Sequence, residues 1–405
     1  MSDEQKKLLP LSGIRVLDFT NNIAGPCTGM LLAERGAEVI HIEKPVLGDD
    51  NRGFAPFVDG MSFSYLWTNK GKKSIVLNLK DPRAKRVVYE MLKDADVLLE
   101  SNRPGAMDRL GFGYKEVHKL NPKLIYCSIS AFGQTGQLSS RPGYDIIAQA
   151  YSGILDQTGE PDGQPVKSGF AIGDFVGAIN AFGSISLALF QRSQTGTGQH
   201  IDIALARGLM WMNQYFDYSI TGQIRNRMGN HDSKLSPYGI FSNPTGSSVV
   251  IGAVNASTWA RLCAAMGKEG LISDPRYDSN GARVIHQKEV KKIIEDWLAA
   301  LGNIDVACEK LAEQGVPHCK VMPYYELATE QHVVENGWIR KTPVPNSVHS
   351  TDVFLGLTGL ATFSDMDILV QRAADLGEHN MEVLQKYGLS AQEIDAMEKE
   401  WASSD

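Results

Sequence analysis

Residues 14–129 alternate short apolar segments with helix-forming segments, and this alternation restricts the fold more than any other feature. Helices are predicted between the apolar segments, for example over 28–35, over 115–120 and from Pro82, where Asp81 supplies a cap. The predicted strands are 14–19, 38–42, 73–79, 97–99 and 124–129. Strands that alternate with helices through short connections are typical of a parallel sheet covered by helices. The chain is therefore predicted to be an α/β protein.

The connections at the carboxyl ends of these strands are the first candidates for a binding site, because parallel sheets bind ligands there. They contain neither a GxGxxG dinucleotide fingerprint nor a Walker A sequence. Several basic residues stand near them: Lys44, Lys70, Lys72, Lys73, Lys80, Arg103 and Arg109. Such cations suit a phosphorylated ligand, although a solvated surface face explains any single one equally well.

The length of 405 residues exceeds one ordinary core and predicts two domains or one domain with an insertion. Further helices are predicted at 144–152, 174–192, 207–220, 259–266 and 284–300, with a strand at 199–204. The stretch 221–237 is polar and turn-rich, and the elements from 238 to about 321 read as a separate unit. We therefore expect domain segments 1–220, 221–330 and 331–405.

Charge and cysteine content exclude several classes of protein. A net charge of −7 argues against nucleic acid as a partner. Five cysteines without a CxxC pair suit a reducing cytoplasm better than a disulfide framework or a zinc site.

Met1–Ser12 has no apolar signal core. The apolar stretch 171–190 carries Asp174 and Asn180, which favours a buried helix over a membrane span.

Asp174 is the candidate for chemistry that stands out, because it is a single carboxylate among small and apolar residues at the start of a predicted helix. One interpretation is an N-cap, for which Asp is a favoured residue. The other is a carboxylate nucleophile whose anionic form the helix N-terminus would favour. The two roles are compatible, and spacing alone favours the cap.

Other catalytic arrangements are missing from the sequence. The histidines, such as His200, His231, His318 and His379, have neither HExxH nor paired spacing, so a metal site is not expected. The serines near Asp174, which are Ser168, Ser184 and Ser186, lie in no GxSxG elbow. An α/β-hydrolase is therefore not indicated.

Several segments together resemble the class III CoA-transferases, also called the CaiB/BaiF family, which include formyl-CoA:oxalate and carnitine CoA-transferases. Gly173-Asp174 stands where this family has its catalytic aspartate. The other matching segments are Leu11–Asp18 with Ala24-Gly25-Pro26, Gly36–Glu43, Asn69–Leu79 with Arg103-Pro104-Gly105, Pro142–Asp145 continuing to Gly153, Gly196–Ala204 and Gly315-Val316-Pro317. The resemblance runs nearly end to end.

The resemblance implies a covalent mechanism without a metal or a tightly bound cofactor. Asp174 would attack an acyl-CoA thioester to form a mixed anhydride, and the released CoA thiolate would convert it into an aspartyl-CoA thioester. The acceptor carboxylate would then repeat these steps in reverse and leave as the new acyl-CoA. Coenzyme A is thus implied as a substrate.

The resemblance also implies CoA contacts by position, with Lys80 and Arg109 as phosphate partners. The positions are Asn22, Ile23, Ala24, Lys44, Leu77, Lys80, Ser101, Arg109 and Ser130. The chain departs from the formyl-CoA:oxalate enzymes at Ser130, where they have lysine, and at Ser101, where they have asparagine. It also lacks their glycine-rich loop near 230–238. These departures count against that particular activity.

The α-methylacyl-CoA racemases of the same family are the alternative. They use a histidine in a Gly-His-Asp triplet, and this chain has Gly143-Tyr144-Asp145 there. A neutral tyrosine, with a reference pKa of about 10, is a poor base at neutral pH. Transfer is therefore favoured over racemisation.

The fold that the family implies is a Rossmann-like large domain built from both chain ends, with a smaller α+β domain between them, in an interlocked homodimer. Relatives use oxalate, small dicarboxylates, 2-hydroxy acids or betaines such as carnitine as acceptors. Trp211, Tyr215 and Tyr218 would suit an apolar or cationic acceptor, because aromatic faces attract quaternary ammonium groups, although residues at this helical spacing are more often core.

Overall fold

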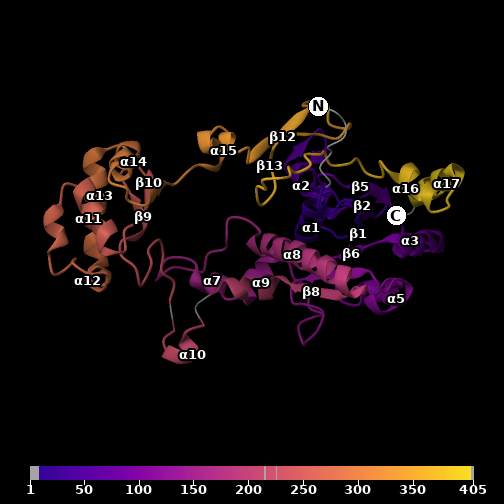
Figure 1. The fold of residues 1–405 in the computed structure, drawn as a ribbon, viewed down its shortest axis with the longest axis horizontal. Helices are drawn as coiled ribbons and strands as arrows, with labels where there is room; N and C mark the ends of the chain where they lie inside the picture. The colour runs from indigo at the N-terminus through magenta and orange to yellow at the C-terminus, as the bar shows by residue number, and fades with distance from the viewer. Residues whose placement is uncertain (1–8, 214–215, 225, 403–405) are drawn as a thin grey trace. The chain divides into compact units, whose positions relative to one another are not determined.

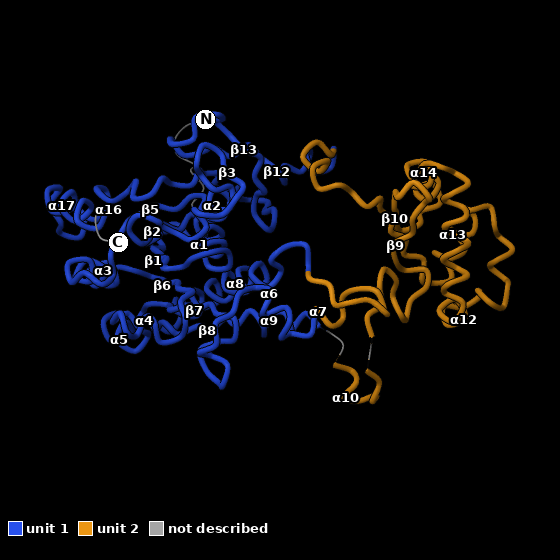
Figure 2. Tube along the Cα trace, turned by 180° about the vertical axis from the view of Figure 1, so that it is seen from behind, with its two compact units in different colours: residues 1–154, 168–214, 331–405 blue, residues 155–167, 215–330 orange. Residues whose placement is uncertain are grey.

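A computed structural model describes residues 9–213, 216–224 and 226–402 of the chain (Figure 1). The chain forms two compact units, which Figure 2 colours separately. The first unit comprises residues 1–154, 168–214 and 331–405, and the second comprises 155–167 and 215–330. Each unit has a hydrophobic core of its own.

The first unit is organised around a six-stranded sheet in which every pairing is parallel. The strands are β1 (Arg15–Phe19), β2 (Glu38–Glu43), β5 (Lys73–Val76), β6 (Val97–Glu100), β7 (Ile125–Ser130) and β8 (His200–Ala204). Their order is β5-β2-β1-β6-β7-β8, so the direction of winding changes between β1 and β6. This is the order of Rossmann-type sheets, whose ligands bind where the winding reverses.

Alternate strand residues face two separate cores, which explains why the strands are apolar throughout. On one face Leu17, Ile40 and Leu98 pack with α3 (Pro82–Asp94) and the C-terminal helices. On the other, Val16 and Val97 pack with α1 (Ala24–Ala33) and α8 (Ile172–Thr195). The mixed α/β fold with a large parallel sheet that the sequence predicts is thus confirmed.

The C-terminal segment completes the first of these faces with α16 (Asn380–Lys386) and α17 (Ala391–Ala402). Trp401 on α17 is 2% exposed, and its indole N–H donates to Asp81 Oδ2 at 3.1 Å. Asp81 in turn accepts the backbone N–H of Arg83 and caps α3. These contacts join residues 320 positions apart into one layer.

The remaining elements of the first unit are short. The helices are α2 (Phe63–Thr68), α4 (Ala106–Leu110), α5 (Tyr114–Leu120), α6 (Asp145–Tyr151), α9 (Leu205–Met212), α15 (Gln331–Glu335) and the 3-10 turn η2 (Asp50–Gly53). Two hairpins are formed by β3 (Phe57–Val58) with β4 (Met61–Ser62) and by β12 (Ile339–Pro343) with β13 (Val353–Leu357).

The second unit packs helices against a three-stranded antiparallel sheet of order β11-β10-β9. Its strands are β9 (Tyr238–Ser242), β10 (Ser248–Gly252) and β11 (His318–Lys320). Its helices are α10 (Tyr218–Thr221), α11 (Ala256–Ala265), α12 (Asn280–Ile285), α13 (Gln287–Leu301) and α14 (Ile304–Glu313), with 3-10 turns η3 (Glu269–Ile272) and η4 (Tyr324–Glu326). The short helix α7 (Ile154–Gln157) lies at the boundary between the units.

Two predicted helices are interrupted in the structure. The helix predicted over 207–220 ends at Met212, because the backbone of Asn213 turns to φ −82°, ψ 98°. Residues 214–215, including Tyr215, lie outside the described part of the chain. The helix predicted over 284–300 is two helices, since His286 (φ −98°, ψ 26°) separates α12 from α13. The strand predicted over 73–79 ends at Val76.

Helix α8 is long and apolar enough to cross a membrane, and it is the one such helix among the described residues. It packs against α1, α6, α9 and the strands β7 and β8. Its N-terminus lies at the carboxyl edge of the sheet, because it is the crossover connection between the parallel strands β7 and β8. It therefore carries Asp174 to the edge where a ligand is expected.

Candidate active site

Asp174 is the third residue of α8, and its carboxylate does not cap the helix. The helix begins at Ile172, and the preceding Ala171 contributes no side-chain hydrogen bond. The cap interpretation of Asp174 is therefore wrong. The acceptor at this helix start is Asp145, whose Oδ1 accepts the N–H of Gly173 at 2.7 Å.

Asp145 is itself held by a buried glutamine. Its Oδ2 accepts from Gln149 Nε2 at 2.6 Å, and Gln149 Oε1 accepts the N–H of Ser168 at 3.1 Å. Gln149 is 1% exposed. A Cβ at Gly173 would lie 2.9 Å from Asp145 Oδ1, so glycine lets Asp145 approach the helix start. The network fixes the turn that presents Asp174.

The surroundings of Asp174 disfavour its negative charge. Burial, and then the neighbouring Asp145 carboxylate, raise the pKa of Asp174 to about 7. The N-terminal turn of α8 acts in the opposite direction, because its free N–H groups stabilise an anion. A carboxylate with such a pKa is more basic than an ordinary aspartate and is a stronger nucleophile once ionised.

Asp174 lines a cleft of about 730 Å³ at the carboxyl edge of the sheet. Its walls come from the connection after β1, the segment after β2, and the starts of α6 and α8. The lining residues are Asn22, Ile23, Leu47, Asp49, Asp50, Gly53, Phe54, Tyr144, Asp145, Ile146, Ala171 and Asp174. Of the residues expected to contact CoA, Asn22 and Ile23 thus share this cleft with Asp174.

A second cleft of about 280 Å³ is lined by three more of the residues predicted to contact CoA. Lys44, Leu77 and Lys80 line it, at the carboxyl ends of β2 and β5. Lys44 pairs with Asp50, whereas Lys80 has no ion-pair partner within the described part of the chain. Asn21 borders this cleft and immediately precedes Asn22 of the first one.

The other predicted positions lie around these clefts in different ways. Ser101 Oγ accepts the N–H of Asn21 at 3.0 Å and so joins the loops that follow β1 and β6. Arg109 is exposed on α4, beside Leu110 of the second cleft. Ser130 Oγ accepts the N–H of Gly133 at 3.0 Å, and Ala24 is 5% exposed within α1. Neither Ser130 nor Ala24 lines either cleft.

Sequence reasoning missed Asp145 and the segment around Asp49 as parts of the site. Asp145 was visible only as the last residue of the Gly143-Tyr144-Asp145 triplet. One local signal in the sequence points to the segment around Asp49: His41 is a polar residue inside the apolar strand β2. It is 1% exposed and lies next to Asp49.

The aromatic residues considered from the sequence belong to different parts of the chain. Tyr144, at the racemase position, lines the cleft with Asp174 and is 72% exposed. Trp211 belongs to the first unit and is 87% exposed, whereas Tyr218 belongs to the second unit. Aromatic rings do gather around Phe175, the residue after Asp174, since its ring centroid lies 5.3 Å from that of Trp67 and 6.2 Å from that of Phe170.

The arrangement can support nucleophilic chemistry by a carboxylate. Within the described residues, no group of three or more His, Cys, Asp and Glu side chains is placed to hold a metal ion. The residues that line the Asp174 cleft include four carboxylates but no histidine, cysteine, lysine or arginine. Burial and Asp145 raise the pKa of Asp174 in this cleft, so Asp174 is the candidate catalytic group.

Comparison with known proteins agrees with this geometry. Residues 11–380 match the model of CoA-transferase family III. The chain is 38% identical over 397 residues to the succinate–glutarate CoA-transferase of Agrobacterium fabrum, covering 95% of this chain and 97% of that one. It is 40% identical over 293 residues to the acetyl-CoA:oxalate CoA-transferase of Acetobacter aceti, covering 72% and 75%. A crystal structure of a CaiB/BaiF family protein from Brucella suis superposes with a TM-score of 0.83 at 31% identity, over 94% of this chain and 100% of that one.

Proposed function

The chain belongs to CoA-transferase family III, and we propose that it moves CoA from an acyl-CoA to a small dicarboxylate through covalent intermediates on Asp174. The observation that carries this proposal is the position of Asp174. It stands at the start of α8, in a cleft that Asn22 and Ile23 also line.

The reaction proceeds in two symmetrical halves. An Asp174 oxygen attacks the thioester carbonyl and the C–S bond breaks. CoA departs as the thiolate, and a mixed anhydride remains on Asp174. The thiolate attacks the aspartyl carbonyl, which releases the donor acid and leaves an aspartyl-CoA thioester. The acceptor carboxylate attacks this thioester and expels the thiolate, which then attacks the acceptor acyl carbon. Acyl-CoA product leaves, and the Asp174 carboxylate is regenerated.

The protonation state of Asp174 decides when the first step starts. Only the carboxylate has the electron pair for attack, and its pKa is raised to about 7 by burial and by Asp145. Activity therefore rises as the pH increases through about 7. Entry of a thioester in place of water leaves the carboxylate less solvated and more reactive.

The substrate class follows from the relatives and the cleft. The two relatives described above act on glutarate and on oxalate, with succinate and acetyl-CoA as counterparts. These acids are small enough to share a cleft of about 730 Å³ with the end of a pantetheine chain. We accordingly assign succinyl-CoA or acetyl-CoA as donor and a short dicarboxylate as acceptor.

The CoA body is placed along the carboxyl edge of the sheet. Asn22 and Ile23 border the thioester end, and Leu77 offers an apolar surface in the second cleft. Lys80 and Arg109 make no ion pair within the described residues, so they are available to phosphate groups. Ala24, Lys44, Ser101 and Ser130 complete the binding positions that we assign.

Acyl exchange between CoA thioesters and a panel of acids tests the proposal. Wild-type protein is expected to convert succinyl-CoA plus glutarate or oxalate into the new thioester, whereas Asp174→Ala and Asp174→Asn lose turnover. Asp395→Asn, an exposed carboxylate on α17, serves as the matched control. Hydroxylamine should trap an acyl-aspartate at Asp174 during turnover. Retained transfer in Asp174→Ala would contradict the covalent route.

The same preparation tests the racemase alternative. Incubation of a 2-methylacyl-CoA in deuterium oxide should give no exchange of the α-carbon hydrogen. The position of the racemase histidine is occupied by Tyr144, which is a poor base. Deuterium uptake in wild-type protein, together with no acid-dependent transfer, would replace the transferase proposal with isomerisation.

A further inference from the structure

A cluster of buried charges lies directly behind the β1–α1 wall of the cleft. Asp18 and His41 are register partners on β1 and β2, and Lys72 immediately precedes β5. Asp49 follows β2 in the segment that lines the cleft. All four side chains are at most 4% exposed. Charges buried this deeply remain ionised only if they are paired.

The cations are shared unequally between the two aspartates. Lys72 Nζ lies 2.7 Å from Asp18 Oδ2 and also donates to Asn69 at 2.8 Å. His41 stands between the aspartates, with Nδ1 3.5 Å from Asp18 and Nε2 3.4 Å from Asp49 Oδ2. Among the described residues, His41 is the one cation within ion-pair distance of Asp49.

His41 lies between two buried carboxylates, which favour its protonated form. Burial alone would lower its pKa, but the Asp18 and Asp49 carboxylates outweigh burial and raise the pKa to about 9. The imidazolium therefore neutralises Asp49, whose Oδ2 has no hydrogen-bond partner of its own among the described residues.

Asp49 fixes the backbone of the cleft wall through its other oxygen. Its Oδ1 accepts the N–H of Asn22 at 3.0 Å and the N–H of Asn51 at 2.9 Å. The Asn51 side chain donates in turn to the carbonyl of Asn22. Both backbone groups of Asn22 are thus held, in a left-handed conformation with φ 70° that a non-glycine residue rarely adopts.

We propose that His41 is a positioning residue for CoA: its buried charge holds Asp49, and Asp49 holds the Asn22–Ile23 wall in the shape that receives the thioester end. This inference rests on the proposed function of the cleft. His41 does not touch the substrate, and its effect passes through one carboxylate to one backbone segment.

Calorimetric binding of free CoA to the full-length protein tests the proposal without requiring turnover. His41→Gln removes the charge that pairs with Asp49, and CoA binding should weaken by about tenfold, as expected for coupled buried groups. Asp49→Asn keeps an oxygen that accepts from Asn22 but loses the charge that pairs with His41, so CoA binding should weaken by less than in His41→Gln. The double variant should match Asp49→Asn alone, because no charge is then left unpaired.

A control histidine separates this effect from general destabilisation. His379 is half-buried, its Nδ1 accepts the N–H of Ser74, and it lines neither site cleft. His379→Gln should leave the dissociation constant of CoA unchanged even if its unfolding midpoint falls. His41→Lys, which keeps a cation, should recover part of the affinity lost in His41→Gln.

The outcomes are distinguishable. CoA affinity that is equal in wild type and His41→Gln overturns the positioning role, as does a double variant that is weaker than both single variants. If His41→Gln does not fold, folding and CoA binding of the double variant support the proposal, and its failure to fold overturns it. Absence of CoA binding to wild-type protein would overturn the proposed function and this inference together.

Discussion

At the scale of single residues, Asp174 stands between two opposed influences. Burial and the neighbouring Asp145 carboxylate disfavour its charge and raise its pKa to about 7, whereas the N-terminal turn of α8 favours an anion. Asp145 also determines the position of that turn by accepting the N–H of Gly173. Asp145 thus fixes the start of α8 and adds to the effect of burial on the pKa of Asp174.

The substitution Asp145→Asn should shift the acid limb of the pH profile of kcat/KM to lower pH. Loss of the neighbouring negative charge lowers the pKa of Asp174, because Asp145 is one of the two causes that raise it. The amide oxygen of the new side chain can still accept from Gly173, whereas its NH2 group replaces the oxygen that accepts from Gln149. The profile is measured between mildly acidic and mildly alkaline pH, with Asp162→Asn as an exposed control. An unmoved acid limb would show that Asp174 does not sense Asp145.

Arg283 is the second residue with a large expected effect, because it is a buried cation without a carboxylate partner among the described residues. It is 1% exposed and donates to the carbonyls of Tyr277 at 2.9 Å and of Ser236 and Val254 at 2.8 Å each. Its guanidinium also lies 5.0 Å from the Trp259 ring. It joins three loops of the second unit to one another.

Arg283→Met should lower the unfolding free energy by about 3 kcal/mol or more, because three buried carbonyls lose their donor. Denaturant unfolding followed by tryptophan fluorescence measures the change. Arg276→Met, on the exposed surface beside Asp274, should leave the midpoint within error of wild type. Equal effects of the two substitutions would contradict the structural role of Arg283.

At the scale of elements, the first turn of α1 reaches the end of β1 only because residue 25 is glycine. A Cβ at Gly25 would lie 2.2 Å from Thr20 Cβ. Thr20 cannot move aside easily, since its N–H and hydroxyl both donate to Asp18 Oδ1, at 3.0 and 2.5 Å. The close approach brings Ile23, at the start of α1, to the wall of the Asp174 cleft.

Gly25→Ala should destabilise the protein by about 2 kcal/mol, within the range expected for overpacking, and should raise the KM for acyl-CoA. Gly281→Ala is the matched control, because a Cβ on this residue of α12 meets no atom within 4 Å. The control should be neutral or more stable by about 0.5–1 kcal/mol, since alanine favours helices. Thermal unfolding and initial rates check both expectations, and a stable Gly25→Ala with normal KM contradicts them.

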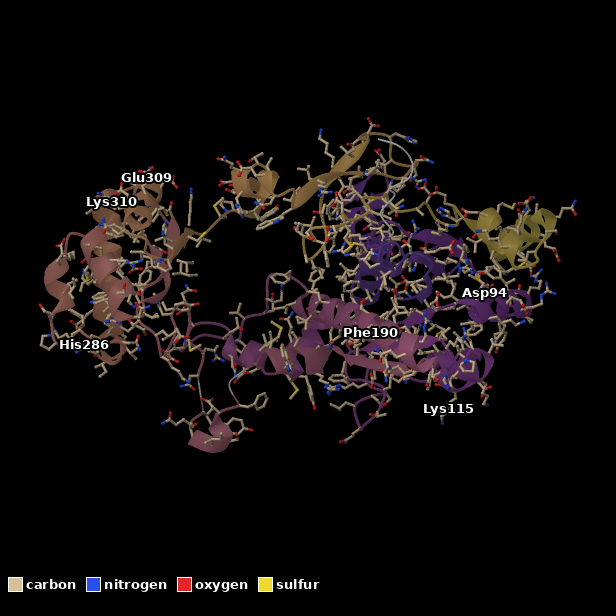
Figure 3. All side chains as sticks on the ribbon, in the orientation of Figure 1. Asp94, Lys115, Phe190, His286, Glu309 and Lys310 are labelled. Atoms are coloured by element: carbon tan, nitrogen blue, oxygen red, sulfur yellow. The ribbon has the colours of Figure 1, made fainter. Side chains whose placement is uncertain are left out.

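At the scale of the whole molecule, one face of the first unit exposes an apolar surface. On α8, Ile179, Leu187 and Phe190 are 48%, 71% and 66% exposed, and Figure 3 labels Phe190 on this helix. A groove of about 610 Å³ beside them is lined by residues that include Ile179 and Trp211. Contiguous apolar patches on a protein surface are candidate interaction sites. We propose that a second copy covers it in the interlocked homodimer that the family implies.

Leu187→Glu should disrupt this assembly by placing a charge in the interface. Light scattering on a size-exclusion column is expected to give wild-type protein about twice the chain mass of 44.4 kDa. The variant should elute with the mass of one chain or fail to accumulate. Ile285→Glu, at an 81% exposed position in the second unit, should remain dimeric. A monomeric wild type, or a dimeric Leu187→Glu, contradicts the proposed interface.

The amino-acid sequence by itself predicts most of the secondary structure of the first unit and singles out Asp174. Strand and helix signals depend on residues close in the chain, so β1, β2, β6 and β7 are found within a few residues of their predicted bounds. The small residues around Asp174 set it apart for the same local reason, although spacing alone favours a cap and only the family resemblance indicates a nucleophile. The breaks after Met212 and at His286 were missed, because apolar periodicity continues through them.

Only the tertiary structure decides which role each polar residue has. Asp145 reaches Gly173 across 28 positions, and Asp49 reaches Asn22 across 27. These contacts assign the helix cap to Asp145, leave Asp174 facing the cleft, and bury His41 between two carboxylates. Burial and charge pairing depend on neighbours that folding brings together, whereas periodicity and turn residues report only on adjacent parts of the chain.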